Sequence, residues 1–406
     1  MHILFLTQVL PYPLDAGPKV RSYYVLRHLA RKHKVTLVSF VRDSDSSEAI
    51  AHLQTFCHAV HSVSIQRSKI KDAAYLLQSL VTGQPFIIAR DWRPAMARLL
   101  AKLAQATPAF DAIHADQLWM APYALYARSL SGGKAKVSTV LDQHNATYMI
   151  PQRLASDENN PLKRVILTLE ARKLAQYEVD ICRKFDHVTW VTQEDFAAVQ
   201  NQVTDGGLIP NAGVIPICSD PEAEPMITCK ANVRRITFLG GLHYPPNAQG
   251  ICWFAEKVFP QILAQVPDAI LTVLGKQPPA ALKNYGIPTV NLEVTGYVAD
   301  PKPYLAETAA FIVPLLAGGG MRVKIIDGWT WGLPVVSTTV GAEGITWQAD
   351  ENIVIADSAA DFACAAIHLL QDRNSAQQMA KAGRQWVLQH YNWRKTYQQW
   401  DQIYPG

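Results

Sequence analysis

The chain has 406 residues, of which 49% are hydrophobic and 18% charged, and its formal net charge is +4. This length fits two domains of about 200 residues each. The six cysteines are scattered without C-x-x-C spacing, which argues against a disulfide framework and a zinc site and favours a reducing compartment. No stretch reaches the roughly 18 apolar residues of a membrane span. We therefore expect a globular protein, with no nucleic-acid partner.

The apolar start HILFLTQVL could be mistaken for a signal peptide, but it lacks a basic leading segment and a small-residue cleavage site. Pro11 and Pro13 end the apolar run. We interpret the segment as a first buried strand and expect a cytoplasmic protein.

Strand-like and helical patterns alternate through the first half of the chain. The strand-like runs are His2 to Leu6, Val35 to Val41, Val60 to Ile65, Asp111 to His114, Val137 to Leu141 and His187 to Val191. Between them lie helical patterns at about 20–32, 45–57, 68–82, 93–106, 117–130 and 161–184. Such alternation predicts an α/β fold with a parallel, doubly wound sheet.

A polar, proline-bearing stretch at 210–230 interrupts the rhythm and is interpreted as a linker. The alternation then restarts, with strands at 235–240, 269–274, 292–296 and 310–315, and helices at 248–264, 358–371 and 373–390. The aromatic end of the chain is expected to pack back across the domain junction. The sequence thus predicts one domain from 1–215 with segment 391–406, a second from 216–390, and a cleft between their sheet edges.

Three consecutive glycines, 318–320, follow the apolar strand at 310–315 and precede a helix that carries Arg322, Lys324 and Asp327. A loop without side chains at a helix N-terminus lets an anion approach backbone N–H groups and the positive end of the helix dipole. Two cations and a hydroxyl acceptor complete the pattern of a nucleoside diphosphate site. The alternative is a simple turn followed by a solvated helix face.

The first half is also the more basic one. Residues 1–215 carry 24 Lys and Arg against 18 Asp and Glu. Seven basic residues fall in 67–102, among apolar runs: Arg67, Lys69, Lys71, Arg90, Arg93, Arg98 and Lys102. Amphipathic basic helices of this kind bind anionic membrane surfaces. A solvated face on a packed domain remains the alternative.

Motifs along the whole chain resemble those of the retaining nucleotide-sugar glycosyltransferases of family four, which have the GT-B fold of two Rossmann-like domains. The resemblance lies in FLTQVLPYPLDAGPKVRSYYVLRHLARKHKVTLVSF, FLGGLHYPPNAQGICWF, VTGYVADPKPYL, KIIDGWTWGLPVVSTTVGAEGI and the closing Tyr391-Asn392-Trp393. It implies transfer of a sugar from a nucleoside diphosphate to an acceptor hydroxyl with retention, in cell-surface polysaccharide, lipopolysaccharide or glycoconjugate synthesis. The implied acceptor is a carbohydrate, a lipid-linked sugar or a small molecule.

The resemblance assigns donor-binding roles in the second half. Asp327 stands where the family has the second Glu of its Glu-x7-Glu motif, which binds ribose hydroxyls. Gly319 replaces the first Glu, so that carboxylate is absent and the backbone of Gly320 and Met321 takes over the donor contact. Gly241 lies in a loop that often carries a basic cluster in the family but has no Arg or Lys here.

Three residues receive catalytic roles from the resemblance. Arg322 and Lys324 match a basic pair that neutralises the departing diphosphate, and His144 matches a histidine that contacts the donor sugar. Gly17 matches the loop glycine near the phosphates. The implied chemistry needs no metal or other cofactor, and the enzyme works in the cytoplasm or peripherally on the inner face of the membrane.

Three other functions compete with this one. A nicotinamide dehydrogenase lacks support because no G-x-G-x-x-G follows a strand. A GT-B sugar-nucleotide epimerase shares the architecture. A catalytically inactive relative that acts as a binding or scaffold protein is suggested by Gly319 and Asp327.

Overall fold

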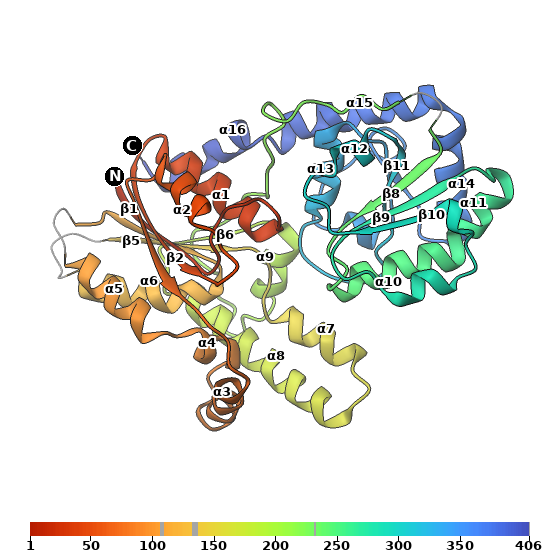
Figure 1. Ribbon diagram of the computed structural model, residues 1–406. Helices are drawn as coiled ribbons and strands as arrows, with labels where there is room; N and C mark the ends of the chain where they lie inside the picture. The colour runs from red at the N-terminus through yellow and green to blue at the C-terminus, as the bar shows by residue number, and fades with distance from the viewer. Residues whose placement is uncertain (106–108, 132–136, 231–232, 406) are drawn as a thin grey trace. The chain divides into compact units, whose positions relative to one another are not determined.

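A computed structural model describes the chain except residues 106–108, 132–136, 231–232 and 406, and except the side chains of residues 69, 157 and 283. The chain forms two compact units (Figure 1). The first comprises Met1–Ile217 and Thr396–Gly406, and the second comprises Cys218–Lys395. Each unit is described below by itself.

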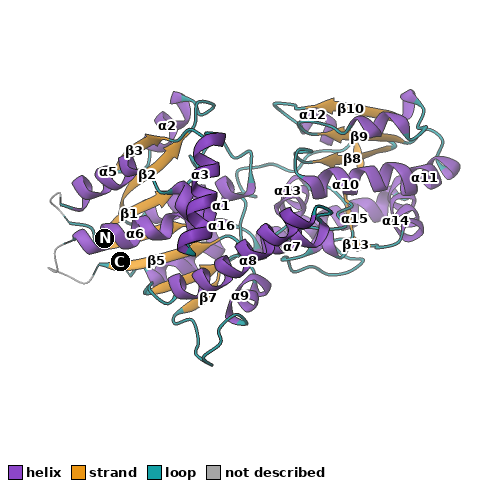
Figure 2. Cartoon of the chain, turned by 90° about the horizontal axis from the view of Figure 1, so that it is seen from below, coloured by secondary structure: helices purple, strands orange, loops and turns teal. Residues whose placement is uncertain are grey.

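The first unit is built on a seven-stranded parallel sheet with the order β3-β2-β1-β4-β5-β6-β7. Its strands are β1 (His2–Thr7), β2 (Lys34–Val41), β3 (Ala59–Ser64), β4 (Ala112–Asp116), β5 (Ser138–Gln143), β6 (His187–Trp190) and β7 (Ala212–Val214). Ile3, Leu4, Phe5 and Leu6 are all fully buried, which requires cover on both faces of the sheet. Figure 2 shows helices on the two faces.

The helices of the first unit largely follow the predicted pattern. They are α1 (Gly17–Ala30), α2 (Ser47–Gln54), α3 (Lys69–Thr82), α4 (Phe86–Asp91), α5 (Pro94–Ala104), α6 (Ala121–Leu130), α7 (Met149–Asp157), α8 (Pro161–Cys182) and α9 (Gln193–Gln200). Side-chain caps begin several of them; Asn160, for example, accepts from the backbone N–H groups of Leu162 and Lys163 at the start of α8. Helices α4, α7 and α9 were not predicted, because they are short.

The second unit contains a six-stranded parallel sheet with the order β10-β9-β8-β11-β12-β13. Its strands are β8 (Arg235–Leu239), β9 (Ile270–Leu274), β10 (Leu292–Gly296), β11 (Thr308–Val313), β12 (Val335–Ser337) and β13 (Val354–Ile355). The predicted helix at 248–264 is continuous from α10 (Pro245–Trp253) through a π-helical turn, η2 (Phe254–Val258), into α11 (Phe259–Gln265). The remaining helices are α12 (Lys302–Leu305), α13 (Val323–Trp331), α14 (Ala359–Gln371) and α15 (Arg373–His390).

Two details of the predicted organisation are corrected. The linker expected at 210–230 contains β7, which extends the first sheet beside β6; three residues are too few for a strand pattern to be recognised. The returning segment begins at Thr396 instead of 391. Residues before it stay with the second unit because Asn392 bridges to Ser219 and the Trp393 N–H donates to the Ser219 carbonyl at 3.1 Å.

The end of the chain is anchored in the first unit, where the two termini lie close together (Figure 1). The Tyr404 hydroxyl hydrogen-bonds to Nδ1 of His114 at 2.8 Å. Asp401 accepts from Lys32 at 2.6 Å and contacts His28 at 3.0 Å. These contacts fasten the last helical turns to the sheet and to α1.

Among the described residues, no helix combines the length and the hydropathy that crossing a membrane requires. In each unit all the strands run parallel, so their carboxyl ends meet along one edge. That edge is where open α/β sheets bind ligands.

Candidate functional site

The glycine loop lies at the carboxyl end of β11, as predicted. Gly318 has φ 121° and Gly320 has φ 75°, a backbone region that residues with a Cβ atom rarely adopt. Helix α13 then begins at Val323 with Arg322 as its N-cap, and no side chain caps it. The backbone conformation therefore favours glycine at positions 318 and 320.

Arg322 holds this loop from within. Only 6% of its surface is exposed. The guanidinium donates to the carbonyls of Gly319 at 2.7 Å and Val340 at 3.2 Å, and it pairs with Glu343 at 3.3 Å. Its charge is thus already partnered, and its geometry is that of a brace between two loops. Glu343 was not singled out from the sequence, although it lies within the motif VGAEGI.

Lys324 is held one turn into α13. Its Nζ donates to Oδ1 of Asn247 at 2.7 Å and lies 4.7 Å from the centroid of the Phe238 ring. Burial, and then repulsion from Arg322, lower the pKa of Lys324 to about 7. An amine in this state gains a full positive charge when an anion arrives beside it.

Asp327 follows Lys324 by three residues on the same helix. Burial, with a further contribution from Glu224, raises its pKa to about 7, against the opposing effect of Lys324. Within the part of the chain that the structure describes, the Asp327 carboxylate makes neither a hydrogen bond nor an ion pair. A partly buried carboxylate without a protein partner is available to accept hydrogen bonds from a ligand.

The loop after β8 closes against these groups. A Cβ atom on Gly275 would lie 1.9 Å from the Gly240 carbonyl, and one on Gly241 would lie 2.6 Å from the His243 ring. A Cβ atom on Gly318 would lie 3.3 Å from the Tyr244 hydroxyl. The ends of β8, β9 and β11 therefore come together with little side-chain bulk between them, and this arrangement brings Gly241 and the predicted residues 319–327 into one region of the second unit.

Gly17 and His144 belong to the first unit. Gly17 is the first residue of α1, and His144 directly follows β5. Nε2 of His144 lies 2.9 Å from Oδ1 of Asp116, whose other oxygen accepts from Ser22 of α1 at 2.8 Å. This link ties the helix that Gly17 begins to His144. Asp116 was missed from the sequence; its position at the end of β4 was the available signal.

The two ring nitrogens of His144 have different surroundings. The residue is 8% exposed, and its Nδ1 has no hydrogen-bond partner among the described residues. Because Asp116 accepts from Nε2, the neutral ring presents Nδ1 as an acceptor. The histidine is thus oriented by a carboxylate, as a residue that contacts substrate needs to be.

Most of the buried groups next to His144 are bound by protein groups, although Nε2 of His114 has no hydrogen-bond partner among the described residues. His114, Asp116 and Asp142 lie within 4.8 Å of one another, a spacing compatible with metal ligation. However, Arg21 donates to both oxygens of Asp142 at 2.7 and 3.0 Å, and Tyr404 occupies Nδ1 of His114. Burial lowers the pKa of His114 to about 4. Arg21 and Tyr404 thus occupy ligand atoms of Asp142 and His114, which does not fit an open metal site.

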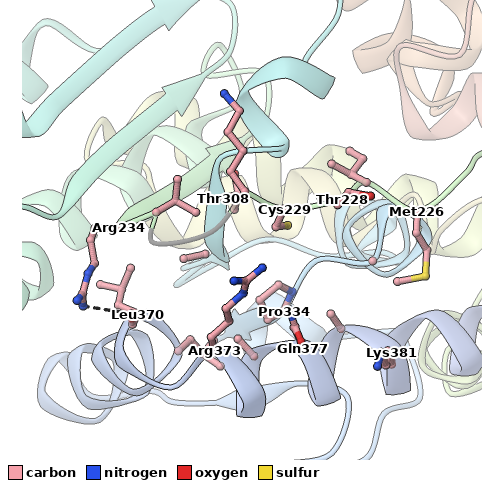
Figure 3. Close-up of a pocket in the computed structure, with 18 of the residues that line it drawn as sticks. Met226, Thr228, Cys229, Arg234, Thr308, Pro334, Leu370, Arg373, Gln377 and Lys381 are labelled. Carbon is pink, nitrogen blue, oxygen red and sulfur yellow. Dashed lines mark hydrogen bonds between the residues drawn. The ribbon is translucent and has the colours of Figure 1, made fainter.

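A separate cavity of about 500 Å³ lies in the second unit (Figure 3). Its walls include Arg234, Thr308 and Pro334, which stand at the amino ends of β8, β11 and β12. It therefore lies at the edge of the sheet opposite the glycine loops. Its position separates it from the candidate site.

Comparison with known proteins shows that the chain is similar to glycosyltransferases. A family model of glycosyl transferases group 1 matches residues 233–372. Over 398 residues the chain is 22% identical to an uncharacterized 44.6 kDa protein in the cps region of Klebsiella pneumoniae, and the match covers 95% of each chain.

Two solved structures illustrate the similarity of fold. HepE of Anabaena, in complex with UDP and glucose, has a TM-score of 0.66 and 15% identity, with 99% of both chains covered. WaaG, a glycosyltransferase involved in lipopolysaccharide biosynthesis, has a TM-score of 0.64 and 14% identity, with 100% of both chains covered. The chain thus has the GT-B fold of two Rossmann-like units, and its segment 233–372 is similar to the glycosyl transferases of group 1.

Proposed function

We propose that this glycosyltransferase moves a sugar from a nucleoside diphosphate sugar to an acceptor hydroxyl with retention of anomeric configuration. The observation that carries the proposal is the pair Lys324 and Asp327, placed beside the glycine loop at the start of α13. One is a shielded cation and the other is a carboxylate without a hydrogen-bond partner among the described residues. The cation and the helix N-terminus suit a diphosphate, and the hydroxyl acceptor suits a ribose.

Lys324 is assigned to the leaving diphosphate. Negative charge on that group grows as the bond to the sugar breaks, and a pre-placed cation in a water-poor site stabilises it. Arg322 supports the reaction mainly by bracing the loop, since its guanidinium is bound to Gly319, Val340 and Glu343. In the retaining mechanism the departing phosphate helps to deprotonate the incoming hydroxyl on the same face of the sugar. The proposed chemistry uses no metal or cofactor.

Asp327 is assigned to the ribose hydroxyls, and the backbone of Gly319, Gly320 and Met321 to the donor. His144 is assigned to the transferring sugar, with Gly17 near the phosphates. For the nucleotide we propose UDP, because HepE was solved with UDP and with UDP-glucose.

For the acceptor we propose a cell-surface polysaccharide, a lipopolysaccharide or a lipid-linked precursor, at the cytoplasmic face of a membrane. Support comes from the cps-region relative and from WaaG. An enzyme that acts on a lipid-linked carbohydrate has to bind it at the bilayer surface. The first unit is the part of the chain that we assign to this contact.

The surface for that contact differs from the basic cluster at 67–102. Arg67 and Arg90 both pair with the buried Asp91, at 2.6 and 3.0 Å, and the side chain of Lys69 lies outside the described part. The better candidate is the exposed apolar surface of α3 and α8, with these residues: Ile70, Leu77, Leu80, Val81, Leu162, Val165 and Leu169. Exposed cations, Lys71 and Lys163 among them, lie on the same helices, a combination that suits an anionic lipid surface.

The nucleotide assignment is tested by calorimetry with UDP-, GDP-, ADP- and dTDP-sugars, followed by NMR of the product anomer. We expect micromolar binding of a UDP-sugar and a product with the donor's anomeric configuration, in the presence of a chelator. An epimeric sugar nucleotide formed without acceptor would identify an epimerase. Binding without transfer or hydrolysis would identify an inactive relative, and an inverted product would overturn retention.

The membrane contact is tested by liposome co-sedimentation. Val81 on α3 is 81% exposed and Val290 in the second unit is 80% exposed, so Val81→Asp and Val290→Asp form a matched pair. We expect only Val81→Asp to weaken binding to anionic vesicles, and salt to weaken it further. Equal effects of the two substitutions, or equal binding to neutral vesicles, would point to a soluble acceptor.

A further inference from the structure

The loop that follows β8 has no Arg or Lys, yet one of its polar residues is built into the candidate site. Asn247, in the first turn of α10, is only 7% exposed. Its Oδ1 accepts from Nζ of Lys324 at 2.7 Å, and its Nδ2 donates to the Gly241 carbonyl at 2.8 Å. The amide therefore joins the cation of α13 to the backbone of the loop.

The space around this contact is closely fitted. A Cβ atom on Gly240 would lie 2.8 Å from Nζ of Lys324 and 3.1 Å from Nδ2 of Asn247. The ring of Phe238 lies against the ammonium on another side, 4.7 Å from it. A side chain at residue 240 would thus displace the ammonium from the position that it has beside Asn247.

The chemistry of the amide matters as much as its place. A carboxylate at this position would form an ion pair with Lys324 and cancel its charge, whereas a neutral carbonyl orients the ammonium and leaves the charge available. The Lys324 ammonium binds Asn247 and forms no ion pair with Asp327, three residues along the helix. A neutral anchor keeps the cation free for an anionic ligand.

We propose that Asn247 is a positioning residue, whose neutral amide fixes the Lys324 ammonium against the Gly240–Gly241 loop so that it faces the donor diphosphate. The proposal rests on the proposed function, because it takes Lys324 as the diphosphate ligand. It also explains how the loop after β8 works without a basic residue of its own. The cation is supplied by α13 and held by the loop.

A double-mutant cycle on UDP affinity tests the coupling. We expect Asn247→Ala and Lys324→Ala each to weaken UDP binding by about tenfold, the size of a hydrogen bond to a charged group. The double variant should bind no more weakly than Lys324→Ala, since Asn247 acts only through the lysine. Additive losses would overturn the proposal.

The matched control is Asn291→Ala. Asn291 is equally buried at 7%, and its amide also donates to backbone, at the carbonyls of Pro267 and Ala269. This variant is expected to lower the melting temperature without changing UDP affinity. An equal loss of affinity in Asn291→Ala would show that Asn247 merely supports the fold.

Asn247→Asp separates orientation from charge. It keeps the shape of the side chain but introduces an anion beside Lys324. We expect weaker UDP binding at neutral pH and an upward shift, by about one unit or more, in the titration of the Lys324 side chain. The titration is followed by NMR of ε-carbon-13 lysine, with Lys324→Arg for assignment. An unchanged titration would overturn the proposal.

The NMR titration needs no ligand, so it keeps the two proposals apart. If the native protein binds no nucleoside diphosphate, the proposed function fails whatever the titration shows. If it binds UDP but the cycle is additive and the titration unchanged, the proposed function stands and the role of Asn247 fails.

Discussion

The carboxyl edges of the two sheets differ in the partners of some of their buried charged groups. In the first unit Arg21 is bound to Asp142, and Glu178 accepts from the backbone N–H groups of Thr147 and Tyr148 at 2.8 and 2.7 Å. In the second unit Asp327 has no partner among the described residues, and Lys324 has only a neutral one. Partnered charges fix a structure, whereas unpartnered charges await a ligand.

This difference predicts that similar substitutions will affect different properties in the two units. In the first unit the loss of a charged side chain leaves its partner buried and unpaired. In the second unit, the loss of Lys324 or Asp327 removes a side chain whose charged form is disfavoured by burial. The first kind of substitution should appear in stability, and the second in binding and turnover.

The largest expected effect is that of Arg21→Met. The Arg21 and Asp142 side chains are fully buried. Burial opposes the ionisation of Asp142, but Arg21 prevails and lowers its pKa. We expect a loss of about 3–5 kcal/mol in the free energy of unfolding, because an unpaired carboxylate remains, measured by denaturant titration. Arg21→Met with Asp142→Leu should recover part of it; a loss below about 1 kcal/mol for the single variant would remove the contrast.

Next comes Lys324→Ala, which should reduce kcat about a hundredfold while donor affinity falls about tenfold, because phosphate charge is greatest in the transition state. Steady-state kinetics and calorimetry measure the two quantities. Lys257→Ala, at an exposed position in the same unit, is the control. A rise in KM with unchanged kcat would make Lys324 a ground-state anchor only.

Glu178→Gln should cost about 2 kcal/mol in the free energy of unfolding, because the new amide N–H₂ meets backbone N–H groups where a carboxylate oxygen accepted them. Burial raises the pKa of Glu178 to about 7, against the opposing effect of these hydrogen bonds. The measurement is denaturant unfolding at pH 7. Unchanged stability would show that the internal hydrogen bonds contribute little.

The smallest expected change in stability is that of Asp327→Asn, and its sign depends on pH. Because folding raises the pKa of Asp327 to about 7, the folded protein holds this proton more tightly, and stability from this group is lost as pH rises from about 4 to 7. Removing the charge should leave stability unchanged near pH 4 and raise it by at least about 1 kcal/mol at pH 8.

The same Asp327→Asn variant should weaken UDP binding, because a neutral amide is a poorer acceptor for ribose hydroxyls than a carboxylate. Thermal unfolding at both pH values and calorimetry with UDP provide the measurements. Unchanged affinity would contradict the ribose assignment, and a loss of stability at pH 8 would mean that the carboxylate is satisfied after all.

Much of the fold was predictable because parallel strands covered on both faces leave long apolar runs. β1, β2 and β9 lie within one residue of the predicted bounds, since most of their residues are apolar. β7 and α7 were missed because a three-residue strand and a short polar helix carry no period of their own. Their conformation is set by the neighbours that they pair with or pack on.

The candidate site divides in a similar way. The glycine loop and the spacing of Arg322, Lys324 and Asp327 could be found along the chain because they lie on one strand, one loop and one helix. Asn247 and Asp116 could not, since each acts on a residue from another element. The different uses of Arg322 and Lys324 were also hidden from the sequence, because two cations two residues apart look alike until their partners are known.

The sequence predicts two α/β units and a glycine loop that precedes a helix with two cations and an acid. These features depend on local conformation and on patterns within single elements. The folded chain adds that Arg322 braces the loop, that Asn247 holds Lys324 and that Asp327 has no partner among the described residues. Those outcomes depend on which strand ends meet at the edge of a sheet, and hence on contacts between residues far apart in the chain.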